Sequence, residues 1–455
     1  MSHTLSTTTP PAAPTRTAPA LLGVSLGYFM VLLDTTALSV AEPDLARSLG
    51  SSTAGLQWVV TAYTVVFGAL LLSAGAVADR YGAHRVFRAA VAVFGAGSLL
   101  CAAAPGLWTL VALRAVLGAA AAACVPASMA MITRLYPQPA RRARAVAVWA
   151  TVSGAALAAG PVLGGVLVAL AGWRAVFVVN GPLAAAALVL VAGGAARCPS
   201  GPRRVDWAAQ AGTCAALGLA TDALIAFGAH AVAHGVCSAL GAGAVGALVA
   251  ARQRRAAAPV LDPRLLRAPG MPAMLVAGAA VGFALTGVLF VLPLLLQHTR
   301  GYGAVATGAA FLPLTVPTVV NPLLVTRRLV ARYGSGSTVR AGLCLLAAAG
   351  GVTGGAMWSA APFAVLAAGL VAAGCGVSLP LPALTTAVVT LAPPGSAGAA
   401  GGVLNAARQL GATLGVAVAG AFVSGGGLLL PGVVCALAAA GPYLARVLRG
   451  RRTPA

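Results

Sequence analysis

The chain alternates long apolar runs with short polar loops. Runs of about 20 apolar residues, the length that crosses a bilayer as a helix, begin near positions 20, 55, 86, 107, 145, 174, 207, 232, 271, 304, 338, 361, 397 and 427. The pattern predicts fourteen membrane-spanning helices and an all-α membrane protein. Because fourteen is even, both ends of the chain are expected on the same side of the membrane.

Composition narrows the class of protein. Of the 455 residues, 60% are hydrophobic and 8% are charged, too few polar groups to cover a soluble domain. No loop is long enough to hold a nucleotide-binding domain. The eight Cys and five His form no cluster with metal-ligand spacing and no buried catalytic constellation. We therefore expect no metal, no cofactor and no enzymatic activity.

The basic residues indicate how the chain sits in the membrane. A net charge of +22 would suggest nucleic-acid binding in a soluble protein. Here, however, 24 of the 29 basic residues, all Arg, fall in loops on one face of the predicted topology. Such a bias marks the cytoplasmic side. We expect no nucleic-acid partner, a location in the cell membrane, and both termini in the cytoplasm.

A short repeat indicates that the chain consists of two related halves. The stretch ADRYG at 78–82 resembles VARYG at 330–334, and each follows the second span of a half. The domains expected are a disordered tail (1–18), a six-helix bundle (19–197), two additional helices with linkers (198–268), a second six-helix bundle (269–448) and a tail (449–455). Transporters built from repeats bind substrate between the halves.

Several motifs occur in a fixed order along the first half. They are LDTTALSVAEP at 33–43, GAVADRYGAHR at 75–85, LRAVLG at 113–118, GPVLGG at 160–165 and WRAVFVVNGP at 173–182. Together they resemble the motifs of the major facilitator superfamily, and specifically of its fourteen-span drug:proton antiporters. The resemblance runs from about residue 20 to 425. It implies two six-helix bundles plus two extra helices.

The basic loop after the second span contains Gly75, Asp79, Arg80, Gly82 and Arg85. Gly75 is expected to allow close packing, and Gly82 to turn the chain. The resemblance implies that this loop latches the two halves in the outward-facing state. A loop that only sets topology would explain the arginines, but not the spacing of glycine and aspartate.

Two charged residues are expected within the membrane of the first half. Asp34 lies deep in the first span, where a carboxylate is costly and functional by default. It either exchanges protons or forms a structural ion pair. Arg114 lies in the fourth span and must be paired or face water, and the resemblance implies that it takes part in proton coupling. Leu117 stands where the family usually has Gln.

The fifth span carries Gly160, Pro161, Gly164 and Gly165, with Ala156 one turn earlier. Small residues every four positions line one helix face and allow another helix to approach closely. Proline removes a backbone donor and bends the helix. The alternatives are a plain packing groove and, by resemblance, a determinant of export rather than import.

Four further polar residues are expected in or near the membrane. Asp222, in the first extra span, is either hydrogen-bonded to a neighbour or recognises a cationic substrate. Arg408, which precedes Gln409, either guards the interface between the halves or pairs with an acid. Glu42 is expected to be solvated at the outer mouth.

The resulting expectation is a proton-driven exporter of small amphipathic drugs or antibiotics that works by alternating access. Its partners would be a small-molecule substrate, protons and the lipid bilayer, and we expect a monomer. The alternatives are a dedicated exporter of one endogenous metabolite, which would confer self-resistance, and a non-transporting membrane enzyme or receptor.

Overall fold

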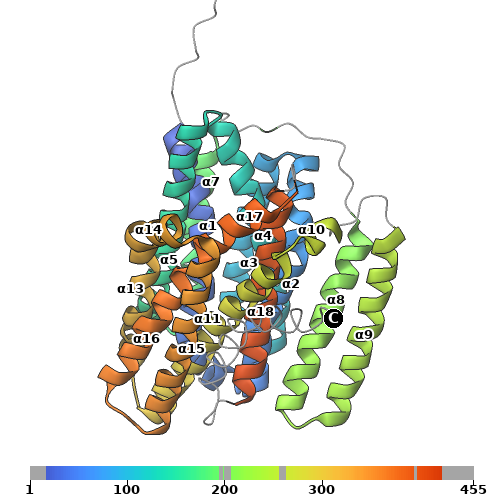
Figure 1. Cartoon of the computed structure of the whole chain (residues 1–455). Coiled ribbons are helices and arrows are strands. Elements are labelled where there is room, and N and C mark those ends of the chain that lie inside the picture. The colour runs from blue at the N-terminus through green and yellow to red at the C-terminus, as the bar shows by residue number, and fades with distance from the viewer. Residues whose placement is uncertain (1–16, 194–197, 199–205, 256–262, 394–396, 423–455) are drawn as a thin grey trace, which may run out of the picture.

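The structure is a computed structural model that describes residues 17–193, 198, 206–255, 263–393 and 397–422. All regular elements within these ranges are helices (Figure 1). The helices α1 to α7, which we call the first bundle, are α1 (Thr17–Leu49), α2 (Thr53–Tyr81), α3 (Ala83–Ala102), α4 (Leu107–Leu135), α5 (Pro139–Ala171), α6 (Arg174–Val178) and α7 (Asn180–Val191).

The helices α11 to α18 form the second bundle, and several of its transmembrane segments are broken. Its elements are α11 (Met271–Thr299), α12 (Ala304–Ala310), α13 (Leu312–Asn321), the π-helix η2 (Pro322–Thr326), α14 (Arg327–Tyr333), α15 (Ser335–Trp358), α16 (Phe363–Ser378), α17 (Pro380–Leu391) and α18 (Ala397–Ala421). The π-helix begins at a proline, which cannot donate the hydrogen bond of a regular α-helical turn.

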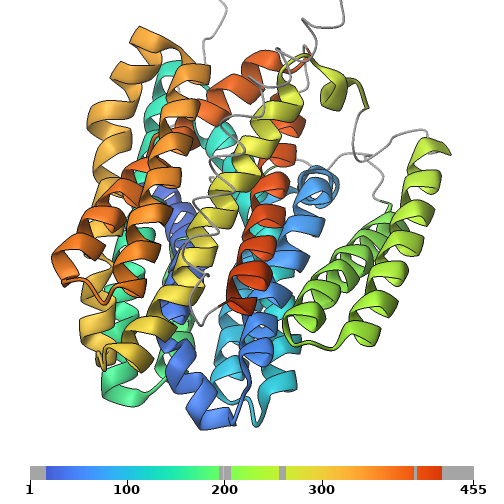
Figure 2. The same cartoon turned by 60° about the horizontal axis from the view of Figure 1, so that its bottom comes forward.

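Two helices stand beside the bundles. They are α8 (Trp207–Gly228) and α9 (Val232–Arg255), and the short helix α10 (Pro263–Arg267) leads on to α11. Both views show α8 and α9 as a hairpin at one edge of the molecule (Figures 1 and 2). The helix α8 packs against α2 of the first bundle and α18 of the second. The two extra helices are therefore peripheral.

Twelve helical segments of the described chain are long and apolar enough to cross a membrane. They coincide with the first twelve of the fourteen predicted spans. The thirteenth predicted span forms the helix α18, which is not among these twelve because it is less apolar. The run that begins near 427 lies outside the described residues. The structure thus shows a multi-pass membrane protein and leaves the count of fourteen as a prediction.

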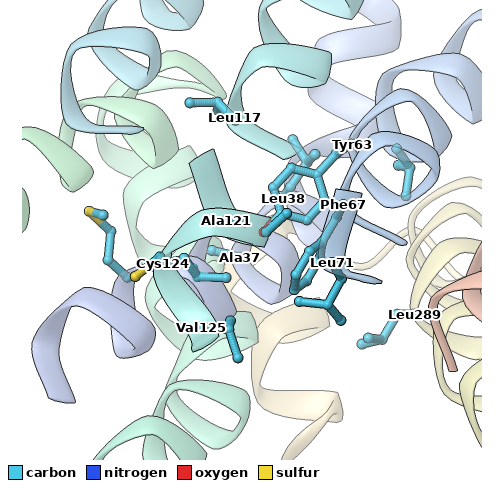
Figure 3. Close-up of a cluster of buried hydrophobic side chains, with 14 of the residues drawn as sticks. Ala37, Leu38, Tyr63, Phe67, Leu71, Leu117, Ala121, Cys124, Val125 and Leu289 are labelled. Atoms are coloured by element: carbon cyan, nitrogen blue, oxygen red, sulfur yellow. The ribbon is translucent and has the colours of Figure 1, made fainter. Parts of the chain in front are cut away.

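Apolar side chains from several helices, among them α1, α2 and α4, fill the interior of the first bundle. Tyr63 and Phe67 of α2 lie edge to face, with ring centres 5.7 Å apart. Leu38 of α1 and Ala121 of α4 gather around them (Figure 3). Since lipid is as apolar as these side chains, close packing rather than the hydrophobic effect holds such helices together.

The two bundles touch most closely near one end of the molecule, where α1 ends and α2 begins. Gln57 Nε2 of α2 donates to the carbonyls of Val416 and Ala417 on α18, at 3.0 and 2.8 Å. Gln297 Nε2 of α11 donates to the Val40 carbonyl of α1 at 3.2 Å. Side-chain amides thus bond to the backbone of the opposite bundle.

The repeated RYG sequence adopts the same local structure in both bundles. Gly82 joins α2 to α3 with φ 87°, and Gly334 joins α14 to α15 with φ 79°. Glycine adopts this left-handed conformation without steric strain. In both copies the preceding Arg lies over the Tyr ring at 5.4 Å from its centre. The equivalence supports an internal duplication, and the predicted turn at Gly82 is confirmed.

One ion pair ties the hairpin together at the end where α8 begins. The Asp206 carboxylate caps α8 by accepting from the Ala209 amide at 3.1 Å. It also accepts from Arg252 Nε of α9 at 3.1 Å. The hydrogen bonds from the Arg252 side chain hold the pKa of the Asp206 carboxyl below its ordinary value. A lowered pKa means that the ion pair stabilises the hairpin at neutral pH, and that this contribution is lost as acid protonates Asp206.

We therefore expect Arg252→Gln to loosen α9 at pH 7. The measurement is hydrogen exchange of the α9 amides, expressed as protection factors corrected for the intrinsic pH dependence of exchange. Wild-type protection should fall on acidification below about pH 4, whereas the variant should start low and change little. Arg254→Gln, which removes an equal charge two residues away, is the control. An equal acid-induced loss in Arg252→Gln and the wild type would contradict the assignment.

Candidate functional site

Asp34 occupies the centre of the first bundle. It lies about 25 Å along α1 from Thr17, at 1.5 Å per residue, and its side chain is fully buried. Its Oδ2 forms an ion pair with Arg114 Nη1 of α4. Its Oδ1 accepts from Asn180 Nδ2, at the start of α7, at 3.0 Å. Both carboxylate oxygens therefore have a partner inside the membrane-spanning region.

Arg114 is held on three sides. It is 1% exposed, and its Nε donates to the Val59 carbonyl of α2 at 3.1 Å. Its guanidinium carbon lies 4.5 Å from the centre of the Tyr63 ring, where the electron-rich face attracts a cation. Asn180 Nδ2 also lies 3.3 Å from Ser98 Oγ of α3. Side chains or backbone from α1, α2, α3, α4 and α7 meet at this one ion pair.

The sequence predicted the depth of Asp34 and the need of Arg114 for a partner, but not that each is the other's partner. The ion-pair alternative for Asp34 is thus present in the geometry, while proton exchange remains a prediction. Leu117 stands in the place of the family's usual Gln and is buried against α3. Its Cδ2 would lie 2.9 Å from a Cβ atom added at Gly97. An apolar contact replaces the expected hydrogen bonds there.

The small residues of α5 contact both bundles. A side chain on Gly160 would overlap Thr36 of α1, and one on Gly164 would begin 2.5 Å from the Ala37 carbonyl. On the other side, a side chain on Gly165 would begin 2.5 Å from the Ala304 carbonyl of α12. Correspondingly, Gly308 of α12 lies against the backbone of Pro161. The predicted packing groove is present, and it joins α5 to α1 and to the second bundle.

A cavity of about 60 Å³ lies between the bundles, next to this groove. The lining residues that the structure describes are apolar apart from hydroxyl groups, and none of them is charged. The lining residues are Thr36, Leu157, Leu285, Leu289, Leu314, Thr315, Thr318, Pro322, Val377, Ser378, Leu381 and Pro382. The Thr315 hydroxyl is buried and has no hydrogen-bond partner among the described residues. It is thus available to a bound molecule, and no sequence motif marked it.

The loop of the first RYG copy departs from expectation at Gly75. A side chain there would meet no atom of the described residues within 4 Å, so the expectation of close packing at Gly75 is wrong in this conformation. Asp79, Arg80 and Arg85 are exposed, which leaves their role as a latch a prediction.

Arg408 and Gln409 of α18 lie at the interface between the bundles. Arg408 Nη1 donates to Asn405 Oδ1 at 3.1 Å, and the guanidinium acts electrostatically on Tyr28 of α1. Gln409 lies beside Gly68 of α2, where an added side chain would begin 2.9 Å from the Gln409 Cβ. Among the described residues Arg408 has no acidic partner, so its placement fits the interface alternative.

Asp222 is hydrogen-bonded within the α8–α9 hairpin. Its Oδ2 lies 2.6 Å from His234 Nε2 and 2.5 Å from Ser238 Oγ, both on α9. Neither α8 nor α9 contributes a residue to the described lining of the cavity. The placement fits the expectation of a hydrogen-bonded acid rather than a substrate contact.

Glu42 is not solvated, contrary to expectation. It is 2% exposed, and its Oε2 is enclosed without a hydrogen-bond partner in the described structure. The physical reason is that α1 continues through Pro43 to Leu49. Glu42 therefore lies about two turns inside the helix rather than at its mouth.

The structure thus contains two bundles of membrane-spanning helices, a cavity between them and a charged pair buried within the first bundle. Comparison with known proteins specifies the class. The family model for the Major Facilitator Superfamily matches residues 24–416. The chain belongs to this superfamily, and is accordingly a transporter of small molecules rather than an enzyme.

Two curated relatives are resistance and export proteins. One is the multidrug resistance protein Stp of Mycobacterium tuberculosis, 34% identical over 410 residues, which are 89% of this chain and 75% of Stp. Another is the cephamycin export protein CmcT of Amycolatopsis lactamdurans, 35% identical over 430 residues, 88% of this chain and 83% of the relative. These relatives support efflux as the transport activity.

A solved structure confirms the fold. The crystal structure of a POT family transporter in complex with 5-aminolevulinic acid superposes with a TM-score of 0.71 and covers 96% of each chain. At 13% sequence identity, the likeness concerns the fold alone.

We expect Asp34 and Arg114 to be energetically coupled. Asp34→Asn leaves the Arg114 charge buried without a counter-ion, which should destabilise the protein by about 3 kcal/mol or more. Adding Arg114→Gln removes that charge, so the double variant should be more stable than the sum of the single effects implies. The measurement is denaturant unfolding of the purified variants. Strict additivity would show that the two side chains do not interact.

The glycines of α5 allow a matched pair of substitutions. Gly164→Ala should destabilise the protein by about 1–3 kcal/mol, because the added methyl group forces α5 away from α1. Gly154→Ala on the same helix should be neutral or stabilising, since its side chain would meet no atom of the described chain within 4 Å. Thermal unfolding in detergent compares the two. Equal melting temperatures for both variants would argue against the packing contact.

Proposed function

We propose that the protein is a proton-coupled exporter of small amphipathic drugs or antibiotics, in which Asp34 exchanges the proton. The observation that carries the proposal is the buried Asp34 carboxylate, paired with Arg114 and hydrogen-bonded by Asn180. Protonation of Asp34 would cancel its charge and release Arg114. The helices that meet at this pair would then change their mutual packing, which couples the proton to conformation.

The cavity supports the substrate class. A lining of apolar side chains with a few hydroxyl groups suits a molecule that is mostly apolar and carries hydrogen-bonding groups. The described lining contains no charge that would select a cation or an anion. A dedicated exporter of one metabolite would use the same cavity. The relative CmcT is named as an export protein for cephamycin, so the experiment below also tests this alternative.

The contacts between the bundles support alternating access. Gln57, Gln297 and Gly165 all bond or pack across the interface near the end where α1 terminates. At the opposite end, a side chain on Gly75 would meet no atom of the described residues within 4 Å. With the cytoplasmic termini that the Arg distribution predicts, the closed end is extracellular and the structure faces inward. The latch at Asp79 would then engage in the opposite, outward-facing state.

The remaining proposals concern the number of spans, the domains, the α5 groove and the oligomeric state. We propose fourteen spans, with α18 as the thirteenth, and a division into two six-helix bundles joined through residues 198–268. The α5 groove is proposed to favour export, because Gly165 and Pro161 bring α5 into contact with α12 of the second bundle. The protein is proposed to act as a monomer.

The test is drug accumulation in cells that express the wild type, Asp34→Asn or Asp222→Asn. A panel of amphipathic antibiotics serves as substrates, with and without a protonophore that collapses the proton gradient. Wild-type cells should exclude at least one compound, and the protonophore should abolish this exclusion. Asp34→Asn should accumulate that compound as untransformed cells do, whereas Asp222→Asn, which removes a membrane acid outside the bundles, should export it normally.

Two results would contradict the proposal. Export by Asp34→Asn at the wild-type rate would exclude Asp34 as the coupling acid. Export that continues after collapse of the gradient would exclude proton coupling. Exclusion of a single compound from a broad panel would favour the dedicated exporter.

A further inference from the structure

The α8–α9 hairpin is attached to both bundles, yet the proposed function assigns it no role. Gln210, in the first turn of α8, is 3% exposed and donates through Nε2 to the Ser73 hydroxyl of α2. At the opposite end of α8, a Cβ atom added at Gly228 would lie 2.5 Å from the Ala421 Cβ of α18. One helix is thus attached to the first bundle at one end and to the second bundle at the other.

The two attachments lie at different depths in the membrane-spanning region. The length of α8 from Gln210 to Gly228 is about 27 Å, at 1.5 Å per residue. Ser73 lies in the second half of α2, towards the Gly82 turn, and Ala421 is the last residue of α18. The helix α8 therefore runs from the cytoplasmic half of α2 to the end of α18 that is proposed to be extracellular.

The part of α18 that α8 contacts through Gly228 also helps to close the interface between the bundles. Gln57 of α2 donates to two carbonyls of α18 near this end. Further along the same pair of helices, the Thr64 and Thr413 hydroxyl oxygens lie 2.8 Å apart. Opening of the extracellular end would break these contacts and move the end of α18 away from α2. Because α8 is attached to both helices, one of its two attachments must then break as well.

The hairpin is built as a stiff element. The Arg252 side chain of α9 binds the Asp206 carboxylate at the start of α8. Further along, Ser238 Oγ of α9 donates to Asp222 Oδ2 at 2.5 Å. Between these bonds, a Cβ atom added at Gly212 would lie 2.5 Å from a side chain of α9. The helix α9 therefore braces α8 along most of its length, and a movement at one end of α8 is passed to the other.

We propose that the α8–α9 hairpin is a strap that holds the extracellular end of the two bundles closed. The inference rests on the proposed function, because it takes from it the alternating access and the orientation in the membrane. The strap stabilises the inward-facing state, in which both attachments are made, relative to the outward-facing state, in which one is lost. Gln210 and Gly228 are thus positioning residues that act on the equilibrium between the two states.

The direction of this bias suits an exporter. An exporter takes up its substrate from the cytoplasm, so the protein at rest must be open on that side. The strap supplies this preference without contacting the cavity, since neither α8 nor α9 contributes a described lining residue. Its strength would set how readily the loaded protein turns outward.

The test removes one attachment at a time. Gly228→Leu forces the end of α8 away from α18, and Gln210→Leu removes the hydrogen bond to Ser73 without adding volume. Gly218→Leu is the matched control on the same helix, because a Cβ atom added there would meet no atom of the described chain within 4 Å. The measurement is hydrogen exchange of the purified full-length proteins in lipid nanodiscs, at one pH and without a transported compound.

Each strap variant should change hydrogen exchange in opposite directions at the two ends of α2. Protection of residues 53–64, at the extracellular end, should fall by about fivefold or more, the lower limit of a typical coupling between two states. Protection of residues 75–85, at the cytoplasmic end, should rise, because the bundles close at one end as they open at the other. Gly218→Leu should exchange as the wild type does at both ends.

Two results would overturn the proposal. Wild-type exchange at both ends of α2 in the folded variants would show that the hairpin does not hold the bundles. A fall at residues 53–64 without a rise at 75–85 would show that the substitutions only loosen local packing. If Gly228→Leu does not fold, Gln210→Leu decides alone. The measurement uses no gradient and no substrate, so its outcome is read separately from the export experiment on Asp34→Asn.

Discussion

The ion pair between Asp34 and Arg114 is the constraint on which the first bundle depends. A charge in the interior of a membrane protein requires a counter-charge or hydrogen bonds, because neither lipid nor apolar side chains solvate it. The pair meets this requirement with groups from five helices, through Asn180, Ser98, the Val59 carbonyl and the Tyr63 ring. A change in the charge of either partner therefore alters the one interaction at which all five helices meet.

The second constraint is how closely the bundles can approach each other. Gly164 brings α5 to the backbone of α1, and Gly165 brings it to the backbone of α12. The helix α5 thus contacts both α1, which carries Asp34, and α12 of the second bundle. A shift of α1 on proton exchange would be passed to the second bundle through α5. Thr36 of α1 and Leu157 of α5 line the cavity, so a shift of α1 against α5 would change the shape of the cavity.

The sequence predicted the parts of the site that depend on single residues. Hydropathy placed Asp34 and Arg114 within the membrane, and glycine chemistry predicted the turn at Gly82. It could not predict that Arg114 binds Asp34, since 80 residues separate them and the fold alone brings them together. Glu42 was misplaced because it was expected at the outer mouth of the first span, whereas α1 continues past it to Leu49. The cavity hydroxyl of Thr315 carries no local signal, because threonine is common in membrane helices.

The central claim is that proton exchange at Asp34 drives export. The most direct measurement uses purified protein in liposomes that contain a pH-sensitive dye, with an imposed gradient of a compound that the protein exports. Substrate moving down its gradient should move protons in the opposite direction in the wild type and change the internal pH, and Asp34→Asn should produce no such change. Proton movement by Asp34→Asn at the wild-type rate would contradict the account.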